Sequence, residues 1–363
     1  MLSCYDLYRI SEQLCKVKNK PDECFGGMNM IFCGDFAQLP PVGGESISLY
    51  SHRSLSDVKT LRGHCSMIGK ALWNQVTYVV ILREGESDRK YRIALENMRY
   101  KSCTKSDIQF LNSLISSNLP GHPSAKFSPW RNAPIIVGEN KYKDEINRLG
   151  TLRFASETKQ KLLRFFSDDI VTSSSPSIKF AKNKKSTINA ISEELQKVLW
   201  DLPTSAYDLN CPGVLDICLG LPVVIRHNVA TELSITKGQK GSIYAWHIGH
   251  GTFGQNVLET IFVLLHEPPK DIQIGELPLN VVPISRRKTS GSITLPDDTK
   301  ITITRNQVDI LPGFAMTAHA SQGQSLDSNA VDLNTLTDHH AWYTALSRSR
   351  SAAKTLILQG FQI

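Results

Sequence analysis

The sequence lacks the features that would place it in a membrane or a disulfide framework. No apolar run reaches the roughly 18 residues that a membrane-spanning helix needs. The first residues, MLSCYDLYRISEQL, carry Asp6 and Glu12 and do not read as a secretory leader. The eight cysteines include no C-x-x-C pair, so no zinc or other metal site is predicted. Scattered cysteines of this kind predict reduced thiols in an intracellular protein without a membrane segment.

A phosphate-binding loop is also missing. The pattern G-x-x-x-x-G-K-[ST] occurs nowhere in the sequence, and Ala71 follows the Gly69-Lys70 pair where Ser or Thr is required. Such a loop supplies several backbone N–H donors and a lysine to the phosphates of a nucleotide. The chain on its own is therefore expected neither to bind ATP tightly nor to unwind nucleic acid.

Composition and charge leave several classes open. The chain has 363 residues, of which 41% are apolar and 21% charged, as in an ordinary globular protein of two or three domains. Its 41 Lys and Arg against 34 Asp and Glu give a net charge of +7. Mild basicity fits a polyanionic partner, but many proteins without such a partner are also basic.

Helices are predicted where apolar residues recur at i, i+3, i+4 and i+7. The first covers Asp6–Leu14, and a chain that begins inside a helix suggests a truncated protein. Asp88–Arg99 is the second. Thr104 with Asp107 makes a capping-box pattern that starts a third. A further helix is expected over residues 188–198, after a lysine-rich stretch (residues 179–185) that we interpret as a solvated loop, with phosphate contact as the less favoured alternative.

Short apolar runs predict strands, and these strands occur in two kinds of sequence context. Met28–Cys33, Val76–Leu82, Pro134–Val137 and Ala330–Leu333 alternate with helices, which is typical of an α/β fold. Between residues 212 and 311, short β-type runs alternate with Gly, Pro and Asp turns instead. That pattern is typical of a small antiparallel barrel inserted between two α/β segments.

The octet GDFAQLPP (Gly34–Pro41) directly follows a predicted strand. Ligands of open α/β sheets bind beyond the carboxyl ends of strands, so Asp35 and Gln38 fall where a nucleotide is expected. The alternative is a strand stopped by two prolines and followed by a turn. We favour a functional site for the whole octet, in which the Gln38 amide is a candidate sensor of the γ-phosphate.

Two later segments carry a second group of candidate residues. Leu311–Leu333 packs His319, Gln322 and Gly323 into five residues, flanked by hydroxyl groups that can follow a sugar–phosphate backbone. YTALSRSR, near the end of the chain, contains Arg348, whose planar and permanently charged guanidinium suits phosphate. The alternatives are a polar loop with a buried histidine and an arginine that interacts with a helix dipole.

The motifs together resemble those of the Pif (petite integration frequency) helicases, superfamily-one motors of the RecD-like branch. FGGMNMIFCGDFAQLPPVGG is similar to the third motif of that family, LPGFAMTAHASQGQSL to the fifth and YTALSRSRS to the sixth. CPGVLDICLGLPVVIRHNVATELSITKGQKGSIYAW is similar to the stretch that leads into its accessory barrel. The resemblance covers nearly the whole chain.

The resemblance implies a role for each candidate residue. Gln38 and Arg348 would be catalytic, as γ-phosphate sensor and arginine finger. The nucleotide-binding set would be Gly34, Asp35, Gln38, Gln322, Gly323 and Arg348. The DNA-binding set would be Asn140, Thr317, His319 and Ser321, although capping of a helix is our preferred interpretation of Asn140.

The resemblance also implies substrates, partners and architecture. ATP with Mg²⁺ and single-stranded or forked DNA are expected, in a monomeric five-prime to three-prime helicase of DNA repair, recombination and telomere maintenance. The compartment would be the nucleus or the mitochondrion. The fold would be α/β, with RecA-like motor domains and an SH3-like barrel: residues 1–125 the incomplete first motor domain, 126–211 and 312–363 the second, and 212–311 the barrel.

Departures from the family pattern favour an incomplete motor. The phosphate-binding loop and the acidic D-E-x-S-M motif are absent, and the Met of that motif would align with Met1. The segment LREGESDRKYR, which starts at Leu82, is shorter than the family pattern, and neither Arg83 nor Arg89 matches the arginine of the family. The alternative function is a non-catalytic remnant that binds single-stranded nucleic acid.

Overall fold

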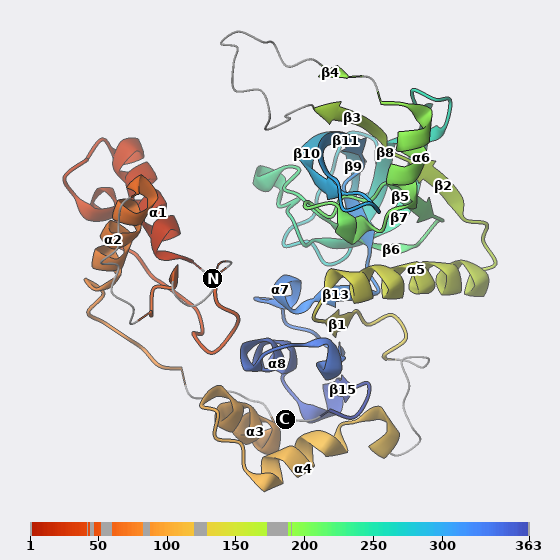
Figure 1. The fold of residues 1–363 in the computed structure, drawn as a ribbon. Coiled ribbons are helices and arrows are strands. Elements are labelled where there is room, and N and C mark those ends of the chain that lie inside the picture. Colours follow the sequence, from red (N-terminus) through yellow and green to blue (C-terminus); the bar gives the residue numbers. More distant parts are fainter. Residues whose placement is uncertain are drawn as a thin grey trace. The chain divides into compact units, whose positions relative to one another are not determined.

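The computed structural model describes residues 2–41, 43, 47–51, 60–82, 88–119, 129–172, 188–189 and 191–361 (Figure 1). The chain divides into two compact units, which are described separately. Unit 1 contains residues 1–127 and 321–363, and unit 2 contains residues 128–320. The lysine-rich stretch and Arg83 lie outside the described residues. Within the described part of the chain, no helix combines the length and apolar character that crossing a bilayer requires.

The first part of unit 1 is a pair of helices, α1 (Cys4–Lys18) and α2 (Leu61–Trp73). A capping box between Ser3 and Asp6 starts α1, and Leu7 is fully buried between the two helices. Gly69 allows the helices to approach closely, because a Cβ there would stand 1.8 Å from the Cys4 carbonyl oxygen. The Gly69-Lys70 pair therefore has a packing role within a helix. The predicted first helix is confirmed.

The predicted strand Met28–Cys33 is wrong, since these residues have no regular secondary structure. Met30 and Phe32 pack against the cluster between α1 and α2, where the Phe32 and Trp73 rings lie 5.5 Å apart. Ile31, on the other side of the backbone, is 88% exposed. The alternation of a strand is thus present, but no described strand pairs with the segment.

The predicted strand Val76–Leu82 is wrong for the same reason. Its residues are extended without strand pairing, and Tyr78, Val79, Val80 and Leu82 are 77–92% exposed. A β-branched apolar run favours a strand only where neighbouring strands satisfy its backbone groups and cover its side chains. No described residue of the chain supplies such a neighbour here.

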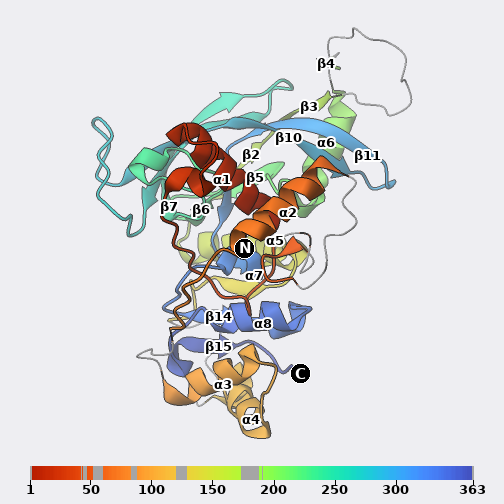
Figure 2. The same ribbon diagram turned by 90° about the vertical axis from the view of Figure 1, so that its left-hand side faces the viewer.

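The second part of unit 1 contains helices α3 (Arg89–Arg99), α4 (Lys105–Ser113) and α8 (His339–Leu346). The capping box of Thr104 and Asp107 is present, as predicted. Strands β14 (Asn329–Val331) and β15 (Thr355–Ile357) pair in parallel, and α8 packs against both β14 and α3. Figure 2 shows α8 beside the two strands, with α3 and α4 beyond them.

Unit 2 begins with a β–loop–α segment, as predicted. Strand β1 (Ile135–Val137) pairs in parallel with β13 (Ala315–Thr317), and α5 (Asn140–Glu157) packs against both. Asn147 on α5 fixes β13, because its Oδ1 accepts the backbone N–H groups of Phe314 and Ala315 at 3.0 and 2.9 Å. The short α7 (Ala318–Ser321) follows β13, and the chain passes there from unit 2 to unit 1.

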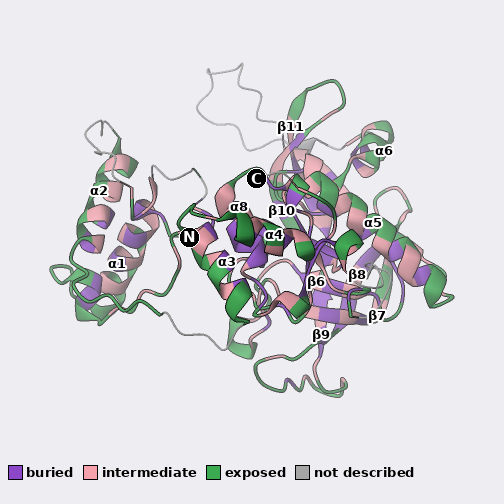
Figure 3. Cartoon of the chain, turned by 90° about the horizontal axis from the view of Figure 1, so that it is seen from below, coloured by how far each residue is buried: buried purple, intermediate pink, exposed green. Residues whose placement is uncertain are grey.

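Antiparallel sheets make up the rest of unit 2, where small β-type runs were predicted. One has the order β12-β6-β7-β8-β9, another β10-β11-β3-β4, and β2 pairs with β5. Figure 3 shows buried residues along β6 and β8 in the interior. The bounds are β2 (Leu163–Phe166), β3 (Asp168–Thr172), β4 (Ile188–Asn189), β5 (Val214–Ile217), β6 (Pro222–Ile225), β7 (Lys240–His250), β8 (Asn256–Leu265), β9 (Val281–Ser285), β10 (Arg287–Thr294), β11 (Lys300–Gln307) and β12 (Ile310–Pro312).

The helix predicted over residues 188–198 is only partly present. Helix α6 spans Glu193–Asp201 and is capped by Ser192, whereas Ile188 lies in strand β4. The serine side chain satisfies a free N–H of the first turn, which fixes the start of the helix five residues later than the apolar pattern indicated. Strands β2, β3, β4, β5, β9, β12 and β13 were not predicted.

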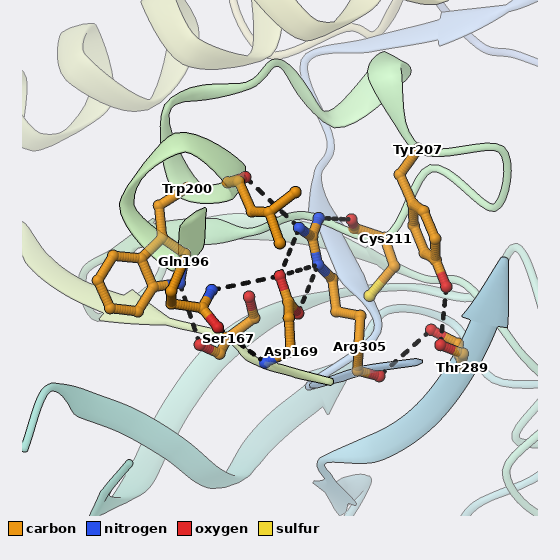
Figure 4. Close-up of polar contacts among 9 residues, drawn as sticks. Ser167, Asp169, Gln196, Trp200, Tyr207, Cys211, Thr289 and Arg305 are labelled. Atoms are coloured by element: carbon orange, nitrogen blue, oxygen red, sulfur yellow. Dashed lines mark hydrogen bonds and ion pairs between the residues drawn. The ribbon is translucent and has the colours of Figure 1, made fainter. Parts of the chain in front are cut away.

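A buried ion pair joins β3 to β11 inside unit 2 (Figure 4). The Arg305 Nη2 lies 2.8 Å from Asp169 Oδ2, and the two side chains are 2% and 0% exposed. Arg305 also donates to the Cys211 carbonyl oxygen, and Gln196 donates to Asp169. The guanidinium stands 5.2 Å from the centre of the Tyr207 ring. These contacts satisfy two charges that would otherwise be costly to bury.

Candidate functional site

The loop Gly34–Pro41 contains a tight turn that fixes Gln38. The Gln38 N–H donates to the Asp35 carbonyl oxygen at 3.2 Å, and the Ala37 N–H donates to Asp35 Oδ1 at 2.9 Å. Leu39 follows and is buried. Pro40 and Pro41 then keep the exit extended. The turn and the buried leucine thus hold Gln38 from both sides.

Helix α8 holds this loop through hydrogen bonds from successive turns. The Leu39 N–H donates to Thr344 Oγ1 at 3.0 Å, and His340 Nδ1 donates to the Ala37 carbonyl oxygen at 2.8 Å. Tyr343 donates its hydroxyl to Asp35 Oδ2 at 2.7 Å. The segments are about 300 residues apart in sequence, yet the structure joins them by two bonds between a side chain and the backbone and one between two side chains.

Arg348 lies just beyond the end of α8, and its guanidinium turns inward. Its Nε donates to the Thr344 carbonyl oxygen at 2.7 Å, its Nη2 to Ser347 Oγ at 2.7 Å and its Nη1 to the Gln324 carbonyl oxygen at 3.2 Å. The residue is 6% exposed. Arg348 therefore connects α8 to the segment that contains the predicted residues Gln322 and Gly323.

The segment around Gln322 and Gly323 is a turn held from both ends. The Gln324 N–H donates to the Ser321 carbonyl oxygen at 3.0 Å, and the Leu326 N–H donates to the Arg348 carbonyl oxygen at 2.8 Å. Gly323 has φ +82°, a backbone conformation that L side chains rarely adopt. All six predicted nucleotide-binding residues therefore lie in unit 1: five on two loops, and Arg348 just beyond the end of α8.

Burial shifts the protonation equilibria of the groups around Arg348. Desolvation lowers the pKa of the Arg348 guanidinium, and the nearby Tyr343, Asp35 and Tyr91 partly offset this. Burial raises the pKa of the Tyr343 phenol, and its hydrogen bond to Asp35 raises it further. Burial also raises the pKa of Tyr91, whose hydroxyl donates to the Leu346 carbonyl oxygen at 2.7 Å. Both phenols therefore remain neutral donors at ordinary pH.

Three of the predicted DNA-binding residues lie in unit 2. His319 is exposed on α7, and the half-buried Thr317 caps the start of α7 by accepting the Ala320 N–H at 3.3 Å. The Asn140 Oδ1 accepts from Lys143 Nζ at 2.9 Å. The capping interpretation of Asn140 is wrong, because the N-cap of α5 is Glu139. Ser321, the fourth residue, belongs to unit 1 and is fully buried.

The described residues do not by themselves form a Mg²⁺ site. Among them, no three His, Cys, Asp or Glu side chains come together in a way that could hold a metal ion. Asp35, the acidic residue of the GDFAQLPP octet, is already bound by Tyr343 and by Arg99, whose Nη2 lies 3.2 Å from Oδ1. A cleft of about 740 Å³ lies in unit 2 between α5 and α6, and no predicted site residue lines it.

The residues that hold the loop Gly34–Pro41 to its surroundings were not predicted from the sequence. Tyr343, Thr344 and His340 come from α8, and Arg99 comes from the end of α3. Tyr343 and Thr344 stand in the YTALSRSR motif, so their presence in a motif was a usable signal. Nothing in the local pattern of α3 distinguishes Arg99 from an ordinary cation at a helix end.

Comparisons with known proteins give distant relatives over nearly the whole chain. No family model matches. Human ATP-dependent DNA helicase PIF1 is 22% identical over 362 residues, which cover 99% of this chain and 44% of the human protein. Uncharacterized protein 030L of Invertebrate iridescent virus 6 is 22% identical over 95% of this chain and 68% of its own length. The chain thus spans less than half the length of the human helicase.

Solved structures show the same relationship at the level of the fold. A crystal structure of Pif1 helicase from Candida albicans aligns with 99% of this chain and 71% of that chain, with a TM-score of 0.58 and 18% identity. The crystal structure of Pif1 helicase from Bacteroides in complex with ADP-AlF3 and ssDNA aligns with 100% of this chain and 69% of that one, with a TM-score of 0.61 and 17% identity. Sequence and structure together confirm the predicted resemblance: over nearly its whole length the chain is distantly similar to Pif1 helicases.

Proposed function

We propose that the chain is the C-terminal part of an ATP-dependent five-prime to three-prime DNA helicase motor. In this proposal, the loop Gly34–Pro41, the turn at Gln322-Gly323 and Arg348 form one wall of the nucleotide site. Thr317, His319 and Asn140 of unit 2 contact the backbone of single-stranded DNA, whereas the fully buried Ser321 does not. The domain division proposed from the sequence, with an accessory barrel over residues 212–311, belongs to the same proposal.

One observation carries the nucleotide part of this proposal. Arg348 and the GDFAQLPP loop are both anchored on Thr344, because its carbonyl oxygen accepts from Arg348 and its hydroxyl accepts from the Leu39 N–H. A motor that hydrolyses a nucleoside triphosphate needs a polar sensor and a cation near the same γ-phosphate. Thr344 binds Arg348 and the Leu39 N–H directly after Gln38, which supports that pairing.

The rest of the nucleotide site has to come from residues that this sequence does not contain. The phosphate-binding loop would supply backbone N–H donors and a lysine, and acidic residues would hold Mg²⁺. Mg²⁺ held by such acidic residues would neutralise negative charge on the phosphates. This chain contributes the sensor amide and the guanidinium. We therefore expect the chain alone to show no DNA-stimulated ATP hydrolysis.

The first experiment measures ATP hydrolysis by the purified chain with and without single-stranded DNA. We expect no turnover above background. Arg348→Ala tests any turnover that appears, and Arg350→Ala is the matched control, because Arg350 is exposed two residues further on. Turnover that is lost with Arg348→Ala and kept with Arg350→Ala would contradict the expected inactivity and show that the chain is itself an enzyme.

The second experiment measures binding of a fluorescent single-stranded oligonucleotide across a salt series. We expect the logarithm of the binding constant to fall linearly with the logarithm of the salt concentration, since phosphate contacts release counterions. His319→Ala should weaken binding roughly two- to tenfold, as loss of one hydrogen bond does. His250→Ala, an exposed histidine on β7 outside every motif, is the control. No binding at low salt would contradict the proposal, and binding without hydrolysis is its expected outcome.

A further inference from the structure

The carboxylate of Asp35 is shared among groups from three parts of unit 1. Its Oδ1 accepts from the Ala37 N–H at 2.9 Å and lies 3.2 Å from Arg99 Nη2 at the end of α3. Its Oδ2 accepts from the Tyr343 hydroxyl on α8 at 2.7 Å. The side chain is 17% exposed. Both carboxylate oxygens are therefore engaged by the protein itself, although the resemblance implied a nucleotide contact for this residue.

The partners of Asp35 complement its charge. Arg99 supplies a positive charge whose side chain is 36% exposed, so this contact is screened by water. Tyr343 supplies a buried neutral donor, and the bond from a hydroxyl to a carboxylate is among the stronger hydrogen bonds. Arg348 lies close enough for the charge of Asp35 to act on its protonation, which links the carboxylate to the end of α8.

The turn that starts at Asp35 also fixes the backbone at Gln38. The Asp35 carbonyl oxygen accepts the Gln38 N–H at 3.2 Å, and the next amide, that of Leu39, is bound to Thr344 at 3.0 Å. Three successive amides, from Ala37 to Leu39, are thus each hydrogen-bonded to Asp35 or to α8. Release of the Asp35 side chain would free the turn on the side of Gln38 that Leu39 does not anchor.

We propose that Asp35 is a positioning residue that acts through Tyr343 and Arg99 to hold Gln38 in register with Arg348, and that it does not contact nucleotide. The assignment rests on the proposed function, because the position of Gln38 relative to Arg348 matters only if both face a nucleotide. It adds Arg99 and Tyr343 to the residues on which the site depends. In this assignment the Asp35 carboxylate fixes the conformation of the loop, and the Gln38 amide contacts the nucleotide.

The test is hydrogen exchange of the backbone amides in residues 35–39, measured on the full chain without ATP or DNA. Asp35→Asn and Tyr343→Phe should each speed exchange roughly tenfold, because a hydrogen bond to a charged group is lost. Arg99→Gln should have a smaller effect in the same direction, and Arg99→Lys should restore slow exchange. Tyr100→Phe is the control, since Tyr100 neighbours Arg99 and is 68% exposed.

Non-additivity separates positioning from a general loss of structure. Arg99→Gln should change exchange in the wild-type chain but add nothing in the Asp35→Asn chain, because its partner is already gone. Amides of α1 and β1 should be unchanged in every variant. If Asp35→Asn unfolds the chain, Tyr343→Phe decides, since it removes one oxygen atom and keeps the ring.

The assignment is overturned if Tyr343→Phe leaves exchange in residues 35–39 within about twofold of wild type, or if Arg99→Gln acts equally in both backgrounds. Neither readout needs a ligand. A chain that fails to bind DNA would contradict the proposed function and leave the role of Asp35 standing, whereas unchanged exchange would contradict only the role of Asp35.

Discussion

The Asp169–Arg305 ion pair of unit 2 is a contact that should be sensitive to a single substitution. Both side chains are at most 2% exposed, so removal of one leaves the other charged and buried. Arg305→Leu should lower the free energy of unfolding by about 3–5 kcal/mol, the usual cost of breaking a buried pair. Urea denaturation of the variant and the wild type measures the difference.

The matched control is the surface pair Arg164–Asp216. Its atoms also lie 2.8 Å apart, but the Arg164 side chain is 62% exposed. Arg164→Ala should therefore cost less than about 1 kcal/mol. Equal costs for Arg164→Ala and Arg305→Leu would show that burial does not set the strength of the Arg305 contact.

Individual site residues were predictable to different degrees. Gln38 and Arg348 stand in motifs with a fixed order, and Thr344 binds both Arg348 and Leu39, the residue after Gln38. Tyr343 and Arg99 were missed, because a hydrogen bond between residues about 300 positions apart leaves no local pattern. Sequence reasoning thus finds the residue that would meet a ligand more readily than the residue that orients it.

At the scale of elements, features set by neighbours in sequence were predicted and features set by distant partners were not. The capping box at Thr104 and the Asp88 cap at the start of α3 depend on residues within one turn, and α3 and α4 begin where expected. The strands at Met28–Cys33 and Val76–Leu82 depend on pairing. Their residues have the apolar pattern, and no described strand lies beside them.

The exposed segment Val76–Leu82 gives a prediction that separates the observed structure from the predicted strand. Val80 is 83% exposed, so Val80→Lys should change the free energy of unfolding by less than about 0.5 kcal/mol. Leu7 is fully buried, and Leu7→Ala should cost about 2–5 kcal/mol. Thermal unfolding of both variants provides the comparison. A large cost for Val80→Lys would mean that the segment is covered in solution.

At the scale of the whole molecule, burial separates two exposed cysteines from three buried ones, and the other three of the eight are partly buried. Cys24 and Cys33 are exposed, whereas Cys4, Cys211 and Cys218 are buried. Burial raises the pKa of Cys211 to about 12, far above the value of an accessible thiol. Because thiolate is the reactive form, Cys211 should stay unmodified under conditions that alkylate Cys24 and Cys33.

Iodoacetamide treatment at pH 8 followed by peptide mass spectrometry measures which cysteines are modified.

The raised pKa of Cys211 also predicts a loss of stability with rising pH. Above the unfolded value of 9.0, the unfolded chain releases the Cys211 proton and the folded chain keeps it, so the free energy of unfolding falls between pH 9 and about 12. Cys211→Ala should reduce that slope. Alkylation of native Cys211 as fast as of Cys24 would contradict its burial.

The apolar run at Val76–Leu82 has a consequence for the lifetime of the chain in solution. Seven residues rich in β-branched side chains, without charge or proline, match the composition of segments that stack between molecules as cross-β ladders. Such stacking requires an encounter of two molecules, so its initial rate rises with the square of concentration. At low concentration, unfolding would limit the lifetime of the native chain. At high concentration, self-association of native molecules through this segment would limit it.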